Sequence, residues 1–133
     1  MAILSRSELQ HAEVLCVREV RVGIPSERVD EIRNFYTLTL GLEPWPAEMQ
    51  IPGGWGLGNP RCGLFLQFEH DPQIDPVRRR FTLRVPDLDL IEQRLGERGW
   101  PYERLHGLGW SDQLILVHDP AGHLIELRQS QPL

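Results

Sequence analysis

The chain has 133 residues, of which 41% are hydrophobic and 25% charged, which is ordinary globular composition. Its 14 basic residues, all of them arginine, face 19 acidic residues and leave a formal net charge of −5. An acidic balance argues against a nucleic-acid partner, because such proteins concentrate positive charge. The absence of lysine from the sequence excludes Schiff-base chemistry and a lysine-dependent phosphate loop.

The remaining composition favours a single soluble domain over residues 1–133. No apolar run approaches the roughly 20 residues that span a bilayer. The first ten residues lack the basic and apolar regions of a signal peptide. Two cysteines are too few for a disulfide framework or a closed zinc site. We therefore expect a cytoplasmic protein without a membrane partner.

The first half of the chain has the pattern of a strand, a helix and further short strands. Residues 14–24 alternate between apolar and polar toward their end, which predicts a strand with one buried face. Ser26 is a candidate N-cap for the helix that follows, and Gly41 is a candidate C′ residue at its end. Residues 42–69 predict shorter strands around a glycine-rich loop at 52–60.

The second half repeats this plan. Residues 80–85 alternate and predict a strand. Asp89, three residues before Glu92, resembles the start of a capping box, and Gly99 ends the helix. Three further strands are predicted around a turn at 119–122, at residues 100–105, 113–118 and 123–128. The repeat indicates two fused modules, at about residues 14–70 and 78–129.

Three segments carry a family resemblance. Residues 118–127 (HDPAGHLIEL) resemble the closing motif of the vicinal oxygen chelate superfamily, which includes glyoxalase I, bleomycin-resistance proteins and extradiol dioxygenases. Residues 34–42 resemble the first helix of that superfamily and its Leu-Gly-Leu exit, and residues 81–89 the opening strand of its second module. The resemblance covers residues 17–129 and implies an α+β fold, in which two βαβββ modules form a curled mixed sheet around a cleft.

The resemblance also implies a set of site positions. Metal-dependent members hold one divalent ion at four positions, which in this sequence are Glu19, Gln67, Arg80 and Glu126. Glu126 matches the family pattern, whereas Glu19 stands where His or Gln is usual and Arg80 where His is usual. A guanidinium has donors but no lone pair for a metal, and its charge repels a cation.

Strand alternation leads to the same four residues independently. Each lies on the polar face of its predicted strand, and the neighbouring residues on the opposite face are apolar. A solvated sheet face has the same pattern as a cleft lining, so alternation leaves both interpretations open.

We favour a small-molecule-binding function without the usual metal. In this hypothesis Arg80 fills the middle of the cleft, pairs with Glu126, Glu19 or both, and binds the ligand together with Gln67. Trp55 and Trp110 supply flat apolar walls at the mouth of the cleft. No cofactor is expected.

The alternative is a divergent divalent-metal enzyme of the lyase, isomerase or dioxygenase type that acts on a small oxygen-rich substrate. Glu19, Gln67 and Glu126 offer three oxygen ligands, which suit Mg²⁺ or Mn²⁺. Glu19 or Glu126 is then the catalytic proton-transfer group. The sequence leaves open whether the protein is an enzyme.

Two further expectations concern the turn and the assembly. His118 and His123 flank the terminal turn, where histidines are usually solvated. The exposed sheet edges of two modules favour a homodimer.

Overall fold

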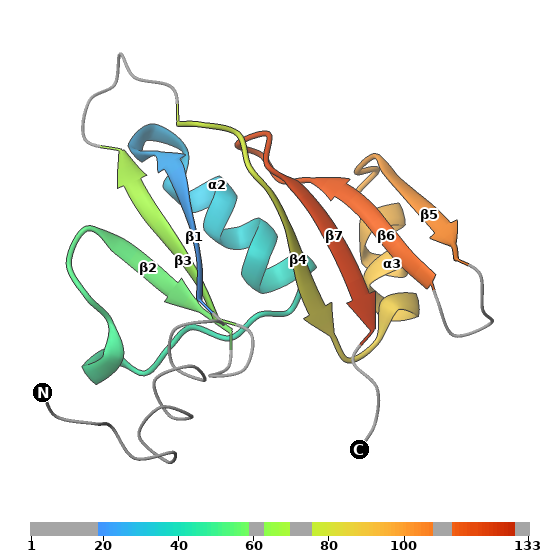
Figure 1. The fold of residues 1–133 in the computed structure, drawn as a ribbon, viewed down its shortest axis with the longest axis horizontal. Coiled ribbons are helices and arrows are strands. Elements are labelled where there is room, and N and C mark those ends of the chain that lie inside the picture. Colours follow the sequence, from blue (N-terminus) through green and yellow to red (C-terminus); the bar gives the residue numbers. More distant parts are fainter. Residues whose placement is uncertain (1–18, 59–62, 70–75, 108–112, 130–133) are drawn as a thin grey trace, which may run out of the picture.

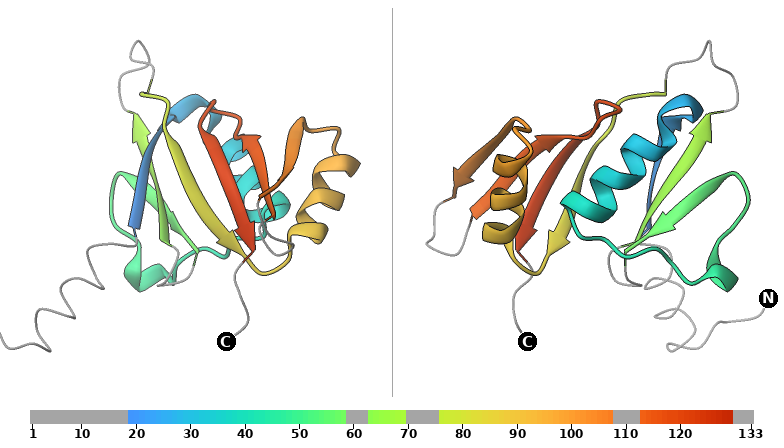
Figure 2. Two further views of the ribbon diagram at one scale, coloured as in Figure 1. Left: turned by 45° about the vertical axis from the view of Figure 1, so that its right-hand side comes forward. Right: turned by 180° about the vertical axis from the view of Figure 1, so that it is seen from behind.

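The structure, a computed structural model, describes residues 19–58, 63–69, 76–107 and 113–129. Two mixed sheets lie side by side, and the helices cover the same side of both (Figures 1 and 2). Within the described ranges, no helix lies on the other side of the sheets. No helix in the described ranges is long and apolar enough to cross a membrane.

The first module begins with a strand and an irregular helix. Pro25, with φ −64°, occupies the N-cap position of the first helical turn and no side chain caps it, so the prediction of Ser26 as N-cap is wrong. Gly41 ends the helix with φ +77°, as predicted. The elements of this module are β1 (Glu19–Pro25), η1 (Ser26–Arg28), α2 (Val29–Asn34), η2 (Phe35–Thr39, a π-helix), η3 (Ala47–Met49), β2 (Gly54–Leu57) and β3 (Gly63–Glu69).

The second module has the predicted order of one strand, one helix and three strands. Its helix is capped by Asp87, whose extended backbone lets the carboxylate accept a hydrogen bond from the Leu90 N–H at 3.2 Å. The cap therefore lies two residues before the predicted Asp89. The elements are β4 (Arg80–Val85), α3 (Leu88–Glu97), β5 (Tyr102–His106), β6 (Gln113–His118) and β7 (Leu124–Gln129).

Both modules have the same strand order. In each, the first strand pairs in parallel with the last strand, which gives β1-β3-β2 in one sheet and β4-β7-β6-β5 in the other. The first module differs by one strand, because its expected first post-helical strand is reduced to a bridge between Pro44 and Leu57. The prediction of an α+β fold built from two related modules is confirmed.

Alternation assigns the two faces of the second sheet. On β4, Phe81, Leu83 and Val85 are buried, and the intervening polar residues are exposed. The buried side chains join residues of α2, α3 and the first sheet in one hydrophobic cluster shared by both modules. Each such side chain contributes roughly 1.5–3 kcal/mol when fully buried, so this pattern fixes which face of the sheet meets the helices.

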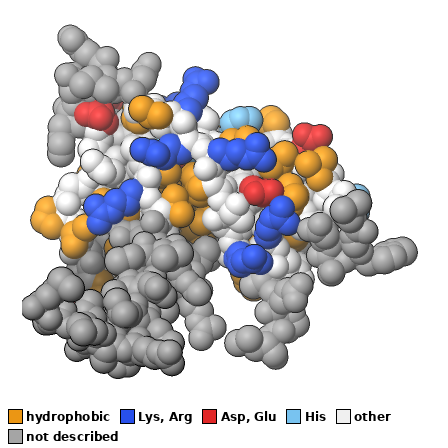
Figure 3. All heavy atoms as spheres, in the orientation of Figure 1, with side chains coloured by type: hydrophobic (Ala, Val, Ile, Leu, Met, Phe, Trp, Pro, Cys, Tyr) orange, Lys and Arg blue, Asp and Glu red, His pale blue; other side chains and the backbone are white. Residues whose placement is uncertain are grey.

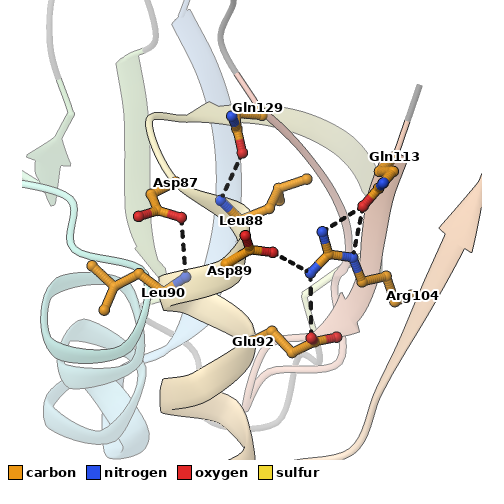
Figure 4. A network of polar contacts seen from close by, with 8 residues as sticks. All are labelled: Asp87, Leu88, Asp89, Leu90, Glu92, Arg104, Gln113 and Gln129. Atoms are coloured by element: carbon orange, nitrogen blue, oxygen red, sulfur yellow. Dashed lines mark hydrogen bonds and ion pairs between the residues drawn. The ribbon is translucent and has the colours of Figure 1, made fainter. Parts of the chain in front are cut away.

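A polar network also holds the second helix to its sheet (Figure 4). Arg104 of β5 lies on the helix side and donates to Asp89 at 2.8 Å and Glu92 at 3.3 Å, both on α3. The same guanidinium donates to the side-chain oxygen of Gln113 on β6. Because this Arg104 side chain is only 20% exposed, the network links three elements in a setting with limited solvent screening.

A second polar cluster joins the two modules. The Tyr36 hydroxyl donates to Asp119 at 2.5 Å, and the other Asp119 oxygen accepts from the His123 backbone N–H at 2.9 Å. The His123 ring donates from Nε2 to the Gly23 carbonyl at 2.7 Å and accepts at Nδ1 from the Arg79 N–H at 3.0 Å. The expectation of a solvated His123 is wrong, since this residue is 1% exposed and links β1 to the segment before β4. His118 is exposed, as expected.

Candidate functional site

The candidate site lies on the side of the second sheet that faces away from the helices. We call this side the open face and define it by Arg80, Thr82 and Arg84 on β4 and by Glu126 and Arg128 on β7. These five alternate with residues buried against the helices. Figure 3 looks onto this side of the molecule and shows basic side chains around acidic ones, with hydrophobic side chains between them.

Glu126 is held by two neighbours on the open face. One carboxylate oxygen accepts a hydrogen bond from the Thr82 hydroxyl at 2.9 Å, and the other accepts one from the Arg128 guanidinium at 3.0 Å. Thr82 lies directly opposite Glu126 in the parallel ladder between β4 and β7. The Glu126 side chain is 19% exposed, so both oxygens are engaged in a mostly buried position.

These contacts keep Glu126 ionised. The hydrogen bond from Thr82 holds the pKa of the Glu126 carboxyl below its usual value, and the positive charges of Arg128 and Arg80 lower this pKa further, against an opposing effect of burial. A carboxylate in this state is an acceptor at neutral pH and has no proton to donate.

Arg80 stands near Glu126 without pairing with it. Its Cα lies opposite Leu124, two residues along the ladder from the Thr82–Glu126 pair, and its side chain is exposed. Among the described residues Glu126 makes its ion pair with Arg128, so the expected ion pair between Arg80 and Glu126 is wrong. The reason is the register, which brings Thr82 rather than Arg80 opposite the carboxylate. The influence of Arg80 on Glu126 is that of a nearby charge.

Apolar side chains extend the open face beyond the charges. Leu114 and Leu116 on β6 and Leu124 on β7 alternate with core residues and are half-buried. Leu116 lies directly opposite Glu126. Leu105, on the neighbouring edge strand, is 37% exposed. The open face thus joins a charged half on β4 and β7 to a largely aliphatic half on β6 and β5, whose polar members are Glu103, opposite Leu116, and His118, opposite Leu124.

The first module gives a different residue at the position that corresponds to Glu126. In the second module, Glu126 lies opposite Thr82, which is two residues after Arg80. In the first module, the residue two places after Glu19 is Arg21, which pairs with Phe65. If Glu19 corresponds to Arg80, as the resemblance implies, this count gives Phe65, which has the same strand parity as the predicted Gln67. Gln67 lies two residues further along β3 and is exposed.

Aromatic packing surrounds Phe65. The Arg21 guanidinium carbon lies 5.3 Å from the centre of the Phe65 ring, and the Trp45 ring centre lies 6.1 Å from it. Gly56 makes room for Trp45, because a Cβ atom there would lie 1.9 Å from Cε3 of the indole. These contacts leave Phe65 only 2% exposed, so this position is an apolar packing site.

The two predicted tryptophans have different outcomes. Trp55 pairs with Leu66, whose side chain packs in the core, and its ring lies 4.2 Å from the guanidinium carbon of Arg33 on α2. Trp55 therefore lies on the helix side, and the prediction that it lines the mouth of the cleft is wrong. The flanking residues on the opposite face of β2 are Gly54 and Gly56. Trp110 lies outside the described residues. The backbone of Glu19 begins β1 opposite Gly63.

Sequence reasoning missed three residues of the open face as site residues. Thr82 and Arg84 share the strand parity of Arg80, and Arg128 shares that of Glu126. The period-two pattern was a sufficient signal for all three. The family motif drew attention to single positions on each strand instead of the whole face.

The donor set of the candidate site does not suit a metal ion. No group of three His, Cys, Asp or Glu side chains close enough to hold an ion occurs within the described ranges. Of the positions that the resemblance implies, Arg80 is a cation and Glu126 already has both oxygens engaged. Phe65, which has the same strand parity as the predicted Gln67, is buried and offers no ligand atom.

A separate hollow lies on the helix side. It measures about 210 Å³ and is lined in part by Phe35 and Thr39 of η2 and by Arg98 and Trp100 after α3. None of the predicted site residues lines it. It is therefore distinct from the open face.

Comparison with known proteins identifies the fold. No protein-family model matches the sequence, and neither does any curated protein. A solved structure from Bacillus anthracis, assigned to the glyoxalase family, matches with a TM-score of 0.67 and 22% identity over 98% of this chain and 100% of its own. The chain has the glyoxalase fold. Two further matches show how varied the functions on this fold are.

The first of these is TnmS3, an antibiotic-binding protein from Streptomyces sp. CB03234, with a TM-score of 0.64 and 23% identity over 98% of this chain and 99% of its own. The second is a lactoylglutathione lyase from Agrobacterium tumefaciens, with a TM-score of 0.56 and 18% identity over 84% of this chain and 92% of its own. One is a binding protein and the other an enzyme, so the glyoxalase fold alone does not decide the function.

Proposed function

We propose that this protein binds a small organic molecule on the open face without a metal ion. The observation that carries the proposal is the state of Glu126, the residue that best matches a metal ligand of the family. Its two oxygens accept from Thr82 and Arg128, and Arg80 adds a third positive neighbour. A divalent ion here would compete with these two hydrogen bonds and would be repelled by two guanidinium groups, which carry no lone pair for it.

Two further observations support binding. The open face offers half-buried leucines next to fixed charges, which is the mixture of apolar surface and few polar groups that small-molecule sites have. The antibiotic-binding neighbour shows that this fold can carry a binding function. The Mg²⁺ or Mn²⁺ enzyme, with Glu19 and Glu126 as catalytic groups, remains the alternative, because another neighbour is a lyase.

Metal analysis separates the two functions. The protein is dialysed against zinc, nickel and manganese, and the metal content of the wild type is compared with Glu126→Ala and with Glu97→Ala, an exposed glutamate on α3 as control. We expect no stoichiometric ion in any variant. One ion per chain in the wild type and Glu97→Ala, lost in Glu126→Ala, would contradict the proposal.

A thermal-shift screen of small metabolites tests the binding itself. Compounds that raise the melting temperature of the wild type are repeated on Leu116→Asn, which changes the open face, and on Leu90→Asn, which changes a 41% exposed leucine on α3. We expect the stabilisation to disappear in Leu116→Asn and to persist in Leu90→Asn. Equal stabilisation of both variants would mean that ligands bind elsewhere.

A further inference from the structure

The open face is a positive area on a negative protein. Arg80, Arg84 and Arg128 lie on two neighbouring strands, and Glu126 is the one acidic residue on the open-face positions of those strands. Three guanidinium groups and one carboxylate leave two positive charges on this area, whereas the whole chain has a net charge of −5. Opposite charges are thus segregated on the molecule, which directs small anions to this face.

Within this area, the contacts of Glu126 involve only one of the three guanidinium groups. Each oxygen of Glu126 is used, one by Thr82 and one by Arg128. In the register, Arg84 and Arg128 lie directly opposite each other, and both make further contacts. Arg80 is exposed at the start of β4 and makes no ion pair with a described residue. A guanidinium in this position retains its full set of five donors for a ligand.

The neighbourhood of Arg80 also specifies the other end of the ligand. The residue opposite Arg80 on β7 is Leu124, which is half-buried, and Leu116 lies on the next strand beside Glu126. A ligand whose acidic group reaches Arg80 therefore has aliphatic surface within its own length. A small ligand with one acidic group fits better than a polyanion, because the net charge of the chain repels a long one.

We propose that the ligand of the open face is a small organic acid with an apolar body, whose anionic group is bound by the Arg80 guanidinium and whose body packs on Leu116 and Leu124. This inference rests on the proposed function and adds the chemical class of its ligand. It makes Arg80 the specificity-determining residue. Glu126 then acts as a fixed negative charge that orients the acid toward Arg80.

A matched pair of probes tests the charge requirement. Naphthoate and naphthamide share the same ring system and differ in the anionic group, and their dissociation constants are measured by NMR titration at low and at high salt. We expect naphthoate to bind about tenfold or more tightly than naphthamide, since hydrogen bonds to charged groups are the stronger ones. We also expect the difference to shrink at high salt.

Variants of neighbouring arginines test the role of Arg80. Arg80→Gln should weaken naphthoate binding about tenfold and leave naphthamide binding nearly unchanged. Arg80→Lys should fall between, because it keeps the charge and loses the planar fork. Arg79→Gln is the control, since residue 79 has the opposite strand parity and its backbone N–H to His123 is kept.

The outcomes separate this inference from the proposed function. Equal affinities for the two probes, no effect of Arg80→Gln, or no naphthoate binding at millimolar concentration would each overturn the organic-acid inference. The proposed function would survive those results if other compounds still lost their stabilisation in Leu116→Asn. It would fail separately if an ion were bound through Glu126.

Discussion

The contact between Tyr36 and Asp119 predicts a large effect of a single hydroxyl on stability. Tyr36 is fully buried, and its hydroxyl donates to an Asp119 oxygen at 2.5 Å, across the junction of the modules. Tyr36→Phe removes this donor and leaves the 3% exposed Asp119 carboxylate with an unpaired oxygen. A hydrogen bond to a charged group contributes about 1.5–3 kcal/mol. For a chain of this length, the loss corresponds to a fall in melting temperature of roughly 5–10 °C.

Urea and thermal unfolding measure this loss. Tyr102→Phe is the control, because it deletes the same hydroxyl from a 37% exposed residue on β5 and should change stability by less than about 0.5 kcal/mol. If Tyr36→Phe were no more destabilising than Tyr102→Phe, the contact would not hold the modules together.

Two further predictions follow from local geometry. The pKa of Glu126 is lowered in the folded state, first by the Thr82 hydrogen bond. The charge of Glu126 therefore stabilises the protein above the unfolded pKa of about 4.3. This stabilisation is lost as the pH falls through the lower folded pKa. The stability difference between wild type and Glu126→Gln should therefore shrink in urea melts below about pH 4, whereas a constant difference would contradict the assignment. Gly56→Ala should destabilise the protein by about 1–3 kcal/mol, because the added methyl group would overlap Trp45. Gly96→Ala should stabilise it by roughly 0.5–1 kcal/mol, because nothing lies within 4 Å of a Cβ at this position of α3. Equal changes in the melting temperatures of the two variants would contradict these predictions.

The sequence was sufficient for the fold because its signals were local. Period-two alternation predicted β4, β6 and β7 closely, and glycines with positive φ, Gly41 and Gly99, ended both helices as expected. The helix starts were less accurate, because Ser26 and Asp89 are side chains of the right type that lie one and two residues away from the actual caps. Cap geometry depends on the backbone that precedes the helix, which composition does not reveal.

The site was harder to predict because it depends on the register between strands far apart in the chain. The sequence indicated that Arg80 and Glu126 share a face, and the structure places both there. It did not indicate that Thr82 lies opposite Glu126 or that Phe65, which has the same strand parity as Gln67, is buried in the first module. His123 shows the same effect, since its burial comes from a contact with Gly23, 100 residues away in the chain.

The assignments of Gln67 and Glu19 to the site, and the homodimer, stay predictions. Sedimentation velocity tests the assembly, for which we expect twice the mass of the 15.4 kDa chain. Ligand titrations of Gln67→Ala test its contribution, with Gln93→Ala on α3 as the control for an exposed glutamine. A monomer, or equal ligand affinity of the two glutamine variants, would contradict the respective prediction.

Guanidinium groups, and no metal ion, provide the positive charge beside Glu126 in the function proposed above. Anomalous diffraction from crystals grown with Mn²⁺ tests it most directly. We expect no manganese peak within bonding distance of the Glu126 carboxylate, with Arg128 still paired to it. A manganese ion bound by Glu126 together with an oxygen ligand from β1 or β3 would contradict it.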